Sequence, residues 1–377
     1  MSYRTLSDLK VLNLSANGAH IIKDGYFARL SDLKRLDLSN NNLSILNDKI
    51  LLPQSNLQYL NLSNNRLEVL NEACFSSLLR LQQLDGSWNR LAKVVPGNLK
   101  LPSLARLLLA RNSRLDFASN ELEQIEDDAL GRLDSLTVLY LTDNELSNRP
   151  KSLPEKLKVF HLERNRIKII QSNDFQNLNQ LETLLLCDNK IATIQENAFN
   201  YLFSILSLDL SEEPTRNFIA WNADDIRSQQ PEATFPLTST EYLIILGLSK
   251  SPGLAHQLLQ DSAALIAARE LQELNLADTD IEYVRSDILH YQELNLADTD
   301  IEYVRSDILH YLPQLRLLHL QGNPLNCTNL YWQAVWMRKQ DEDVHAKVTC
   351  ASPAEFWSIP LVDLHTKAKT QPPLPVN

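Results

Sequence analysis

The stretch Leu57-Gln-Tyr-Leu-Asn-Leu-Ser-Asn-Asn65 carries the pattern LxxLxLxxN, which returns along the whole chain. Its strongest copies are spaced 24 residues apart and begin at Leu9, Leu33, Leu57 and Leu81. Less regular copies begin at Leu104, Leu136, Leu157, Leu181 and Leu315, and weaker ones at Ile205, Leu243, Leu271 and Tyr291. A repeat of about 20 to 29 residues with this pattern predicts a leucine-rich-repeat solenoid.

The pattern also predicts the structure of each coil. Apolar and polar residues alternate around Leu60 and Leu62, which indicates a short strand with these leucines inside and Tyr59 and Asn61 outside. Asn65 follows where the chain turns, and its amide can bond backbone groups of neighbouring coils. Stacked coils then form a parallel β-sheet on the concave face, opposite an irregular convex side, in an α/β horseshoe fold.

The second half of each coil is apolar at constant offsets from the asparagine. The residues at these offsets include Leu67, Leu70, Phe75, Leu78, Ile167, Ile170, Phe175, Leu178, Ile191, Ile194, Phe199 and Leu202. One coil cannot bury its own leucines, so its neighbours must supply the core. An array of amphipathic helices is the alternative, and offsets repeated over eight or more units argue against it.

The repeat count predicts the domain organisation. We expect residues 1–323 to form a solenoid of about 13 repeats, 324–365 a C-terminal cap and 366–377 a disordered tail. The repeats are irregular at 105–120, where Asn112 and Asn120 cannot both hold the same coil position and one piece is expected to loop out. They are also irregular at 211–270, where Phe218, Trp221 and Ile226 keep the convex offsets and 228–240 is expected to be a surface loop.

The third irregular stretch, 272–311, holds an identical tandem copy. Residues 272–291 and 292–311 both read QELNLADTDIEYVRSDILHY, at a spacing of 20 residues instead of 24. Because solvent-facing residues repeat as well as buried ones, we interpret the copy as a recent duplication or a sequence-assembly error. Four residues fewer predict a tight or distorted coil near Tyr291.

Charge and hydropathy exclude some functions. The net charge of −11 argues against a basic nucleic-acid-binding surface, and no apolar stretch approaches the length of a membrane span. The N-terminus has no signal-peptide pattern and enters a repeat almost at once. We expect the natural N-terminal cap and signal peptide to be missing from this chain. An end that stays open or pairs with another subunit is the alternative.

The C-terminal part carries a second motif. Asn323-Pro324 leads into Cys327 and a tryptophan-bearing segment, and Cys350 follows. Together with the 24-residue repeats, this resembles the cysteine-flanked cap of extracellular leucine-rich-repeat proteins, such as Toll-like receptors, Slit-type guidance proteins and insect adhesion receptors. That cap usually has four cysteines, and here Asn329 stands at the second position and no fourth cysteine follows.

The resemblance implies that the two remaining cysteines, Cys327 and Cys350, form a disulfide. Trp332, Trp336 and Trp357 would then cover the leucines of the last coil. Two free buried thiols in a cytosolic protein are the alternative. The other cysteines, Cys74 and Cys187, are interpreted as core thiols. Four Asn-x-Ser/Thr sites are N-glycosylation candidates, although the repeat itself generates three of them: Asn13, Asn42, Asn61 and Asn326.

No catalytic motif is present in the sequence. It has no phosphate loop, dinucleotide fingerprint, GxSxG elbow or zinc-ligand spacing, so we predict that the protein is not an enzyme and needs no cofactor or metal. The concave face remains as the candidate ligand-binding site. Its middle coils place an apolar strip and one histidine in outward positions, at Leu108, Val138, Tyr140, Val159, His161 and Leu185. Exposed apolar surface with a polar rim suggests a protein interface, and local packing between adjacent coils is the alternative.

These observations predict an extracellular protein-binding or adhesion module, a fragment of a receptor or secreted protein, that binds a protein ligand through its concave or lateral surface. The resemblance makes innate-immune recognition one option beside cell adhesion and axon guidance, and it leaves homodimers and heterodimers open. A cytoplasmic scaffold or regulatory protein and a mis-assembled gene product are the competing interpretations. The Pro372–Pro375 segment of the tail could bind a proline-reading domain, but a disordered end or linker explains it more simply.

Overall fold

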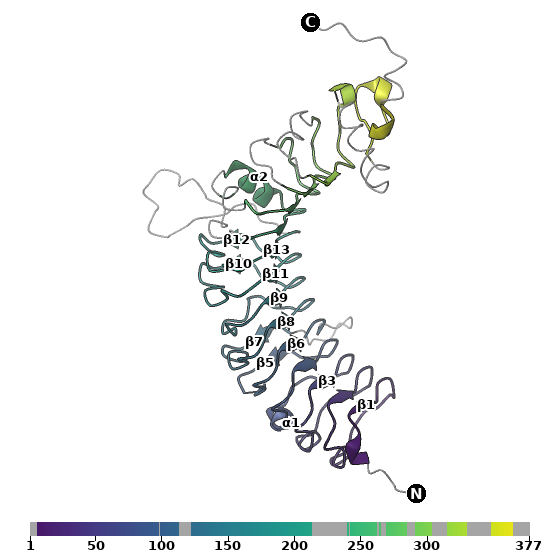
Figure 1. Cartoon of the computed structure of the whole chain (residues 1–377), viewed down its shortest axis with the longest axis vertical. Helices are drawn as coiled ribbons and strands as arrows, with labels where there is room; N and C mark the ends of the chain where they lie inside the picture. The colour runs from purple at the N-terminus through teal and green to yellow at the C-terminus, as the bar shows by residue number, and fades with distance from the viewer. Residues whose placement is uncertain are drawn as a thin grey trace. The chain divides into compact units, whose positions relative to one another are not determined.

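The computed structural model describes residues 6–97, 99–112, 122–212, 240, 242–261, 264, 269–284, 291–303, 315–329 and 348–364. The chain forms two compact units (Figure 1). The first contains Met1–Ile194 and Ala198–Ile205, and the second contains Gln195–Asn197 and Leu206–Asn377. Among the described helices, none is long and apolar enough to cross a membrane.

The first unit is built on a parallel sheet of three-residue strands. In sheet order these are β1 (Val11–Asn13), β2 (Arg35–Asp37), β3 (Tyr59–Asn61), β4 (Gln83–Asp85), β6 (Arg106–Leu108), β8 (Val138–Tyr140), β9 (Val159–His161) and β11 (Thr183–Leu185). The central leucines pair in register, Leu12 with Leu36 and Leu36 with Leu60. Each strand is the one that the repeat pattern predicts, which confirms the leucine-rich-repeat solenoid.

The opposite wall of this unit has little regular structure. It contains α1 (Glu72–Phe75) and two short parallel pairs, β5 (Lys93–Val94) with β7 (Gln124–Ile125) and β10 (Ile169–Ile170) with β12 (Thr193–Ile194). The 3-10 helix η1 (Leu6–Asp8) precedes β1. The apolar residues predicted for this wall are at most 2 % exposed, for example Leu67, Phe75, Ile170 and Phe199. The constant offsets in the sequence therefore mark core positions.

The second unit continues the same kind of coil. Its parallel strands are β13 (Ser207–Asp209), β14 (Ile245–Gly247), β15 (Glu273–Asn275), β16 (Glu293–Asn295) and β17 (Leu317–His319), with helix α2 (Pro252–Gln260) after β14. Both tandem copies form strands, since Glu273 pairs with Glu293. Tyr291 is buried, and this burial raises the pKa of its hydroxyl. The residues expected to be distorted, 285–290, lie outside the described part.

Buried asparagines connect successive coils. Asn165 Nδ2 donates to the carbonyl oxygens of Leu141 and Leu162, both at 2.9 Å, and its Oδ1 accepts from the Leu146 amide at 3.1 Å. The asparagines at the same position make the equivalent pairs of carbonyl contacts: Asn41, Asn65, Asn89, Asn112, Asn144, Asn189 and Asn323. This ladder satisfies backbone groups that the core would otherwise leave unpaired.

Three coils of the second unit use hydroxyl groups in place of the ladder asparagine. Ser251 donates to the Leu210 carbonyl at 2.9 Å, Thr279 to that of Leu276 at 2.7 Å, and Thr299 to that of Leu296 at 3.1 Å. A hydroxyl has only one proton to donate, whereas the asparagine amide has two. The coils formed by the weaker sequence copies therefore have fewer side-chain hydrogen bonds to the backbone at this position.

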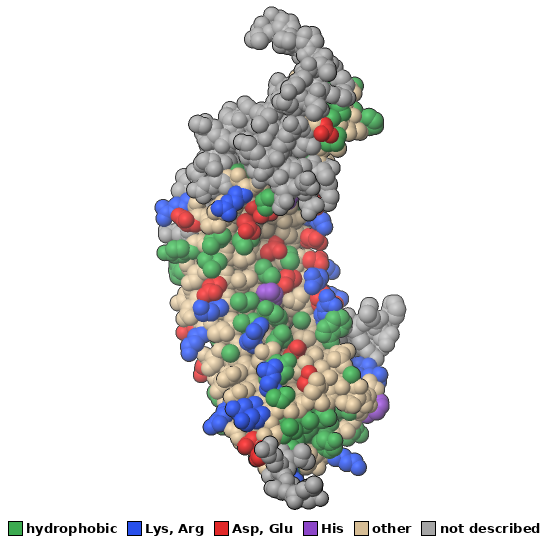
Figure 2. Space-filling view, turned by 45° about the vertical axis from the view of Figure 1, so that its right-hand side comes forward, with side chains coloured by type: hydrophobic (Ala, Val, Ile, Leu, Met, Phe, Trp, Pro, Cys, Tyr) green, Lys and Arg blue, Asp and Glu red, His purple; other side chains and the backbone are tan. Residues whose placement is uncertain are grey.

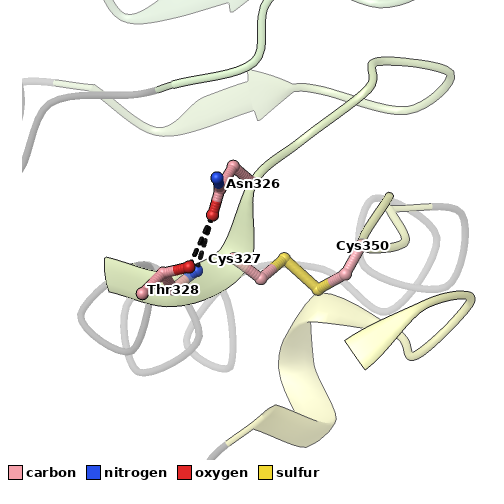
Figure 3. Close-up of a disulfide and its surroundings, with 4 residues drawn as sticks. All are labelled: Asn326, Cys327, Thr328 and Cys350. Atoms are coloured by element: carbon pink, nitrogen blue, oxygen red, sulfur yellow. Dashed lines mark hydrogen bonds between the residues drawn. A yellow bond between two sulfur atoms is a disulfide. The ribbon is translucent and has the colours of Figure 1, made fainter. Parts of the chain in front are cut away.

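The C-terminal residues contain the disulfide that the resemblance implies. Cys327, in the 3-10 helix η3 (Cys327–Asn329), is bonded to Cys350, with a Cα–Cα distance of 5.7 Å (Figure 3). Two further 3-10 helices, η4 (Ala354–Phe356) and η5 (Leu361–Asp363), follow.

Two sequence predictions need correction, and several others fall outside the described part. Trp357 does not cover the last coil, because it is 71 % exposed. The turn of η4 buries the preceding Phe356 instead, and Leu361 and Leu364 are also buried.

Cys187 is only half-buried and is not a core thiol, whereas Cys74 is fully buried. Burial raises the pKa of the Cys74 thiol to about 11. The remaining predictions concern residues that are not described: Asn120, Phe218, Trp221, Ile226, Trp332 and Trp336.

Removing one ladder side chain tests the ladder. Replacing Asn165→Ala leaves the buried Leu146 amide without a partner and removes one of the two ladder bonds to each of the Leu141 and Leu162 carbonyls, which keep Asn144 and Asn189. We therefore expect the unfolding free energy to fall by about 1 to 3 kcal/mol. Asn165→Thr should lose less, since Thr279 shows that a hydroxyl keeps one of the bonds. Urea unfolding followed by circular dichroism measures both. Equal losses for the two variants would contradict the role assigned to the amide.

The disulfide gives a second test. Cys350→Ser removes the constraint on the 23-residue separation between the two cysteines, so we expect a loss of about 3 kcal/mol in unfolding free energy in the chain-entropy description. Cys74→Ser, at a thiol outside the disulfide, controls for loss of a buried sulfur. A reducing agent should lower the unfolding temperature of the wild type but not that of the Cys350→Ser variant.

Candidate functional site

The predicted strip forms two neighbouring rows on the sheet of the first unit. In one row Leu108 pairs with Tyr140, Tyr140 with His161 and His161 with Leu185. In the other row Val138 pairs with Val159, between Arg106 and Thr183. All six strip side chains are partly accessible to solvent. The register thus joins the predicted residues into one patch over four consecutive coils.

The same row has a structural role in the coils nearer the N-terminus. There an aspartate or asparagine ends each strand and accepts a hydrogen bond from the backbone amide two residues on. The four acceptors are Asn13, Asp37, Asn61 and Asp85, at 2.8 to 3.0 Å. Such Asx contacts stabilise the turn that leaves the strand. In these coils the residue at this position is therefore polar because it stabilises the turn of its own coil.

The strip lacks this Asx residue in four successive strands, whereas in the second unit Gly247 and His319 replace it singly. Leu108, Tyr140, His161 and Leu185 occupy the Asx position in four successive strands, and Leu108, Tyr140 and Leu185 cannot accept the bond through a carboxylate or amide. Asp209 resumes it, accepting from the Ser211 amide at 3.0 Å. Four consecutive coils thus carry side chains at this position that do not stabilise their own turn.

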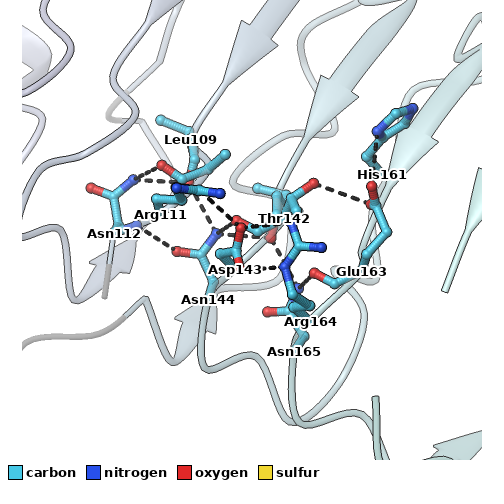
Figure 4. A network of polar contacts seen from close by, with 12 residues as sticks. Leu109, Arg111, Asn112, Thr142, Asp143, Asn144, His161, Glu163, Arg164 and Asn165 are labelled. Carbon is cyan, nitrogen blue, oxygen red and sulfur yellow. Dashed lines mark hydrogen bonds and ion pairs between the residues drawn. The ribbon is translucent and has the colours of Figure 1, made fainter. Parts of the chain in front are cut away.

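Two rings at the centre of the strip are stacked and held in place. The rings of Tyr140 and His161 lie 4.3 Å apart between centroids, at an interplanar angle of 24°. His161 Nδ1 lies 3.2 Å from Glu163 Oε1, and the Thr142 hydroxyl donates to Glu163 Oε2 at 3.1 Å (Figure 4). Glu163 itself is only 8 % exposed. The histidine ring is thus anchored from one side while part of its surface stays accessible.

A charged ladder borders the strip. Arg111 Nε lies 3.1 Å from Asp143 Oδ2, Arg164 Nη2 lies 2.9 Å from the same oxygen, and Arg164 Nε also contacts the carboxylate (Figure 4). The Arg111 guanidinium lies 4.5 Å above the ring of Trp88, a cation–π geometry. All four residues directly precede a ladder asparagine and have positive φ between 52° and 56°. This turn directs their side chains along one edge of the sheet.

Two arginines of this charged ladder share one carboxylate and stay partly exposed. Hydrogen bonding to Arg164, together with the charges of both arginines, lowers the pKa of Asp143 despite some desolvation. Two arginines face this one carboxylate, and their side chains remain 47 % and 46 % exposed. Figure 2 shows hydrophobic side chains gathered on this face of the first unit with basic and acidic groups on either side. The site combines an apolar strip with a partly available cationic edge.

The sequence prediction found the strip but missed the charged ladder that borders it. The strip follows from counting outward strand positions, whereas Trp88, Arg111, Asp143 and Arg164 occupy a position that the pattern leaves unspecified. The available signal was the alternation of charge at that position in successive repeats, through Arg111, Asp143, Arg164 and Asp188.

Other candidate residues are dispersed. Of the glycosylation candidates, Asn13 is exposed, and Asn42, Asn61 and Asn326 are half-buried. Asn326 Oδ1 accepts from the Thr328 amide and hydroxyl at 3.1 and 2.7 Å (Figure 3). Within the described ranges, no group of three or more His, Cys, Asp or Glu side chains could hold a metal ion.

Comparisons with known proteins agree with this fold. A family model described as Leucine rich repeat matches residues 7–53 and 155–214, and a second, Leucine Rich Repeat, matches residues 56–78. The chain folds as a leucine-rich-repeat solenoid and resembles extracellular leucine-rich-repeat proteins.

Particular relatives cover only part of the chain. Leucine-rich repeat transmembrane protein FLRT2 of Homo sapiens is 36 % identical over 119 residues, which are 30 % of this chain and 18 % of that protein. Keratocan of Mus musculus is 36 % identical over 95 residues, or 25 % of this chain and 27 % of that protein. Toll-like receptor 7 of Mus musculus is 39 % identical over 90 residues, or 24 % of this chain and 9 % of that receptor. The chain thus matches less than a third of each of these relatives.

The lowered pKa of Asp143 predicts a pH-dependent contribution to stability. A depressed pKa stabilises the fold above the ordinary aspartate value of about 4, and this contribution is lost as the pH falls through the folded-state value. Asp143→Asn should therefore lower the unfolding free energy at pH 7 by less than about 1 kcal/mol, because the pair is partly exposed. The difference from wild type, measured by urea unfolding from pH 7 downward, should shrink as the pH falls through the lowered pKa of Asp143. A constant difference across this range would contradict the ion-pair account.

Proposed function

We propose that this protein is a non-catalytic recognition module that binds a protein ligand through the concave face of its first unit. The proposed contact residues are Leu108, Val138, Tyr140, Val159, His161 and Leu185. The observation that carries the proposal is the replacement of the turn-stabilising Asx residue in four successive coils by two leucines, a tyrosine and a histidine. A contiguous apolar patch with an aromatic centre is the kind of surface from which interface hot spots are built.

The border of the strip indicates the chemistry of the ligand. Apolar and aromatic groups of a partner would pack on Leu108, Tyr140 and Leu185. Arg111 and Arg164 share one carboxylate, so a carboxylate of the partner can complete their pairing. We therefore infer a protein ligand that presents an apolar or aromatic anchor next to an aspartate or glutamate.

An extracellular or cell-surface setting supports this role. Disulfides persist in oxidising compartments, and the chain contains one between Cys327 and Cys350. The names of two relatives describe a transmembrane protein and a receptor, and none of the three describes an enzyme. We propose that residues 324–365 act as the cap of the solenoid in that setting, and that adhesion or receptor recognition is the biological process.

The proposal is tested by placing charge in the strip. Tyr140→Asp combined with Val159→Asp should weaken capture of a binding partner at least tenfold, because a buried unpaired carboxylate disfavours the interface. The screen uses an array of purified extracellular protein domains, and surface plasmon resonance measures affinity for any domain that binds the wild type. Val11→Asp is the matched control, since Val11 is outward and 57 % exposed in the row of Val159.

Circular dichroism and unfolding temperature establish that each variant is folded. Unchanged affinity of the folded double variant for every captured domain would remove the strip from the binding site. Equal loss in the Val11→Asp control would show that added negative charge, rather than the strip, weakens binding.

A further inference from the structure

The coil that follows β8 is shorter than its neighbours. Its ladder asparagines, Asn144 and Asn165, are 21 residues apart, whereas Asn165 and Asn189 are 24 apart. Five residues after the ladder asparagine, other coils place a buried aliphatic side chain, which in β5, β10 and β12 belongs to a short convex strand, and this coil places Arg149. Pro150 follows and has no amide to donate to a strand ladder. The short coil therefore forms no convex strand between β7 and β10.

The missing strand leaves two strand edges facing the same gap. Among the described strands, β7 pairs with β5 alone and β10 with β12 alone, so no described strand pairs with their edges toward the short coil. The three coils concerned are consecutive, because β6, β8 and β9 are adjacent in the concave sheet. Two coil spacings of about 4.8 Å put roughly 10 Å between β7 and β10, which is the room that one intervening strand occupies.

A cavity of about 650 Å³ lies in this gap, which we call the notch. One side of it is formed by Gln124 and Ile125 of β7, and the other by Ile169 of β10 and Gln171. Its floor comes from the short coil, with Ser147, Asn148 and Arg149. The vacant volume thus coincides with the position of the missing strand.

The three basic side chains of the notch are each paired with one of its acidic side chains. Arg149 Nε lies 2.9 Å from Asp174 Oδ1, with both side chains 13 % exposed, and Arg149 Nη1 donates to the carbonyls of Pro150 and Lys151. Arg166 contacts Glu145, and Lys151 Nζ lies 3.2 Å from Asp127 Oδ2. The lining holds four acidic and three basic side chains and is close to neutral, which favours recognition through an uncharged backbone over recognition of an ion.

We propose that the notch binds an extended peptide segment of a partner protein, which adds one parallel or antiparallel strand between β7 and β10. Backbone hydrogen bonds to the two edges would give the affinity, and the polar floor would select small or uncharged polar side chains toward Arg149. Proline in the centre of the segment would remove a required amide. The notch lies on the wall opposite the concave strip, so it is a second interaction surface independent of the proposed ligand site.

The test uses a display library of random ten-residue peptides, selected on the intact wild-type chain. Selected peptides are measured by fluorescence anisotropy against wild type and against Asn148→Trp, which fills the notch from its floor at an exposed position. We expect at least a tenfold loss of affinity. Val69→Trp is the matched control, because Val69 is 61 % exposed at the same position of another repeat, four residues after its ladder asparagine. It should bind as wild type does.

Backbone recognition is tested on the peptide itself. N-methylation of single central amides should reduce affinity at least tenfold at successive positions, since neighbouring amides of a strand face opposite sides and a strand edge lies on each side of the notch. Tyr140→Asp with Val159→Asp should leave this binding unchanged, which separates the notch from the concave strip.

Three outcomes would overturn the proposal. A selection that yields no peptide weakened by Asn148→Trp would show that the notch takes no peptide. Full tolerance of every single N-methylation would show binding through side chains alone. Concentration-dependent dimerisation of the wild-type chain that Asn148→Trp abolishes would assign the notch to a second copy of this chain instead of a partner protein.

Discussion

The structure depends on the need of each coil for its neighbours. A coil has too little interior to bury its own leucines, and its turn leaves carbonyl groups that no strand can pair. The buried asparagines meet the second need, because each amide donates to carbonyls of its own coil and of the preceding one. The effect of neighbours is visible at the end of the sheet: Leu12, in a strand paired on one side only, is half-buried, while Leu36 is fully buried between two strands. Packing and hydrogen bonding thus impose the same repeat.

This constraint explains what the sequence could predict. Residues that touch neighbouring coils must recur at fixed offsets, so the strands, the asparagine ladder and convex positions such as Phe175 and Phe199 were predictable from spacing alone. Residues that face solvent are free to vary, so the Arg111–Asp143–Arg164 ladder carried only a weak signal. Trp357 was assigned wrongly because resemblance gives a residue type for the C-terminal segment but not the turn that decides whether Phe356 or Trp357 faces inward.

Departures from the repeat are informative because the repeat itself is physically required. On the concave face, four coils lose the Asx residue that stabilises the turn, and they gain an apolar strip with a stacked Tyr140–His161 pair. On the opposite wall, one coil loses three residues and its convex strand, and it gains a polar notch floored by Arg149. Both departures are compensated locally, by Glu163 and the charged ladder in the first case and by the Arg149–Asp174 pair in the second. Neither compensation is needed to close a standard coil.

The most direct measurement restores the ordinary repeat in the strip. A variant with Leu108→Asp, Tyr140→Asn, His161→Asn and Leu185→Asp regains the turn-stabilising acceptor in all four coils, and its thermal unfolding and partner binding are compared with those of the wild type. If the strip exists for recognition, the variant unfolds at the same temperature or higher and loses binding. A large fall in unfolding temperature with partner affinity unchanged would show that these side chains serve packing between coils, and it would contradict the account.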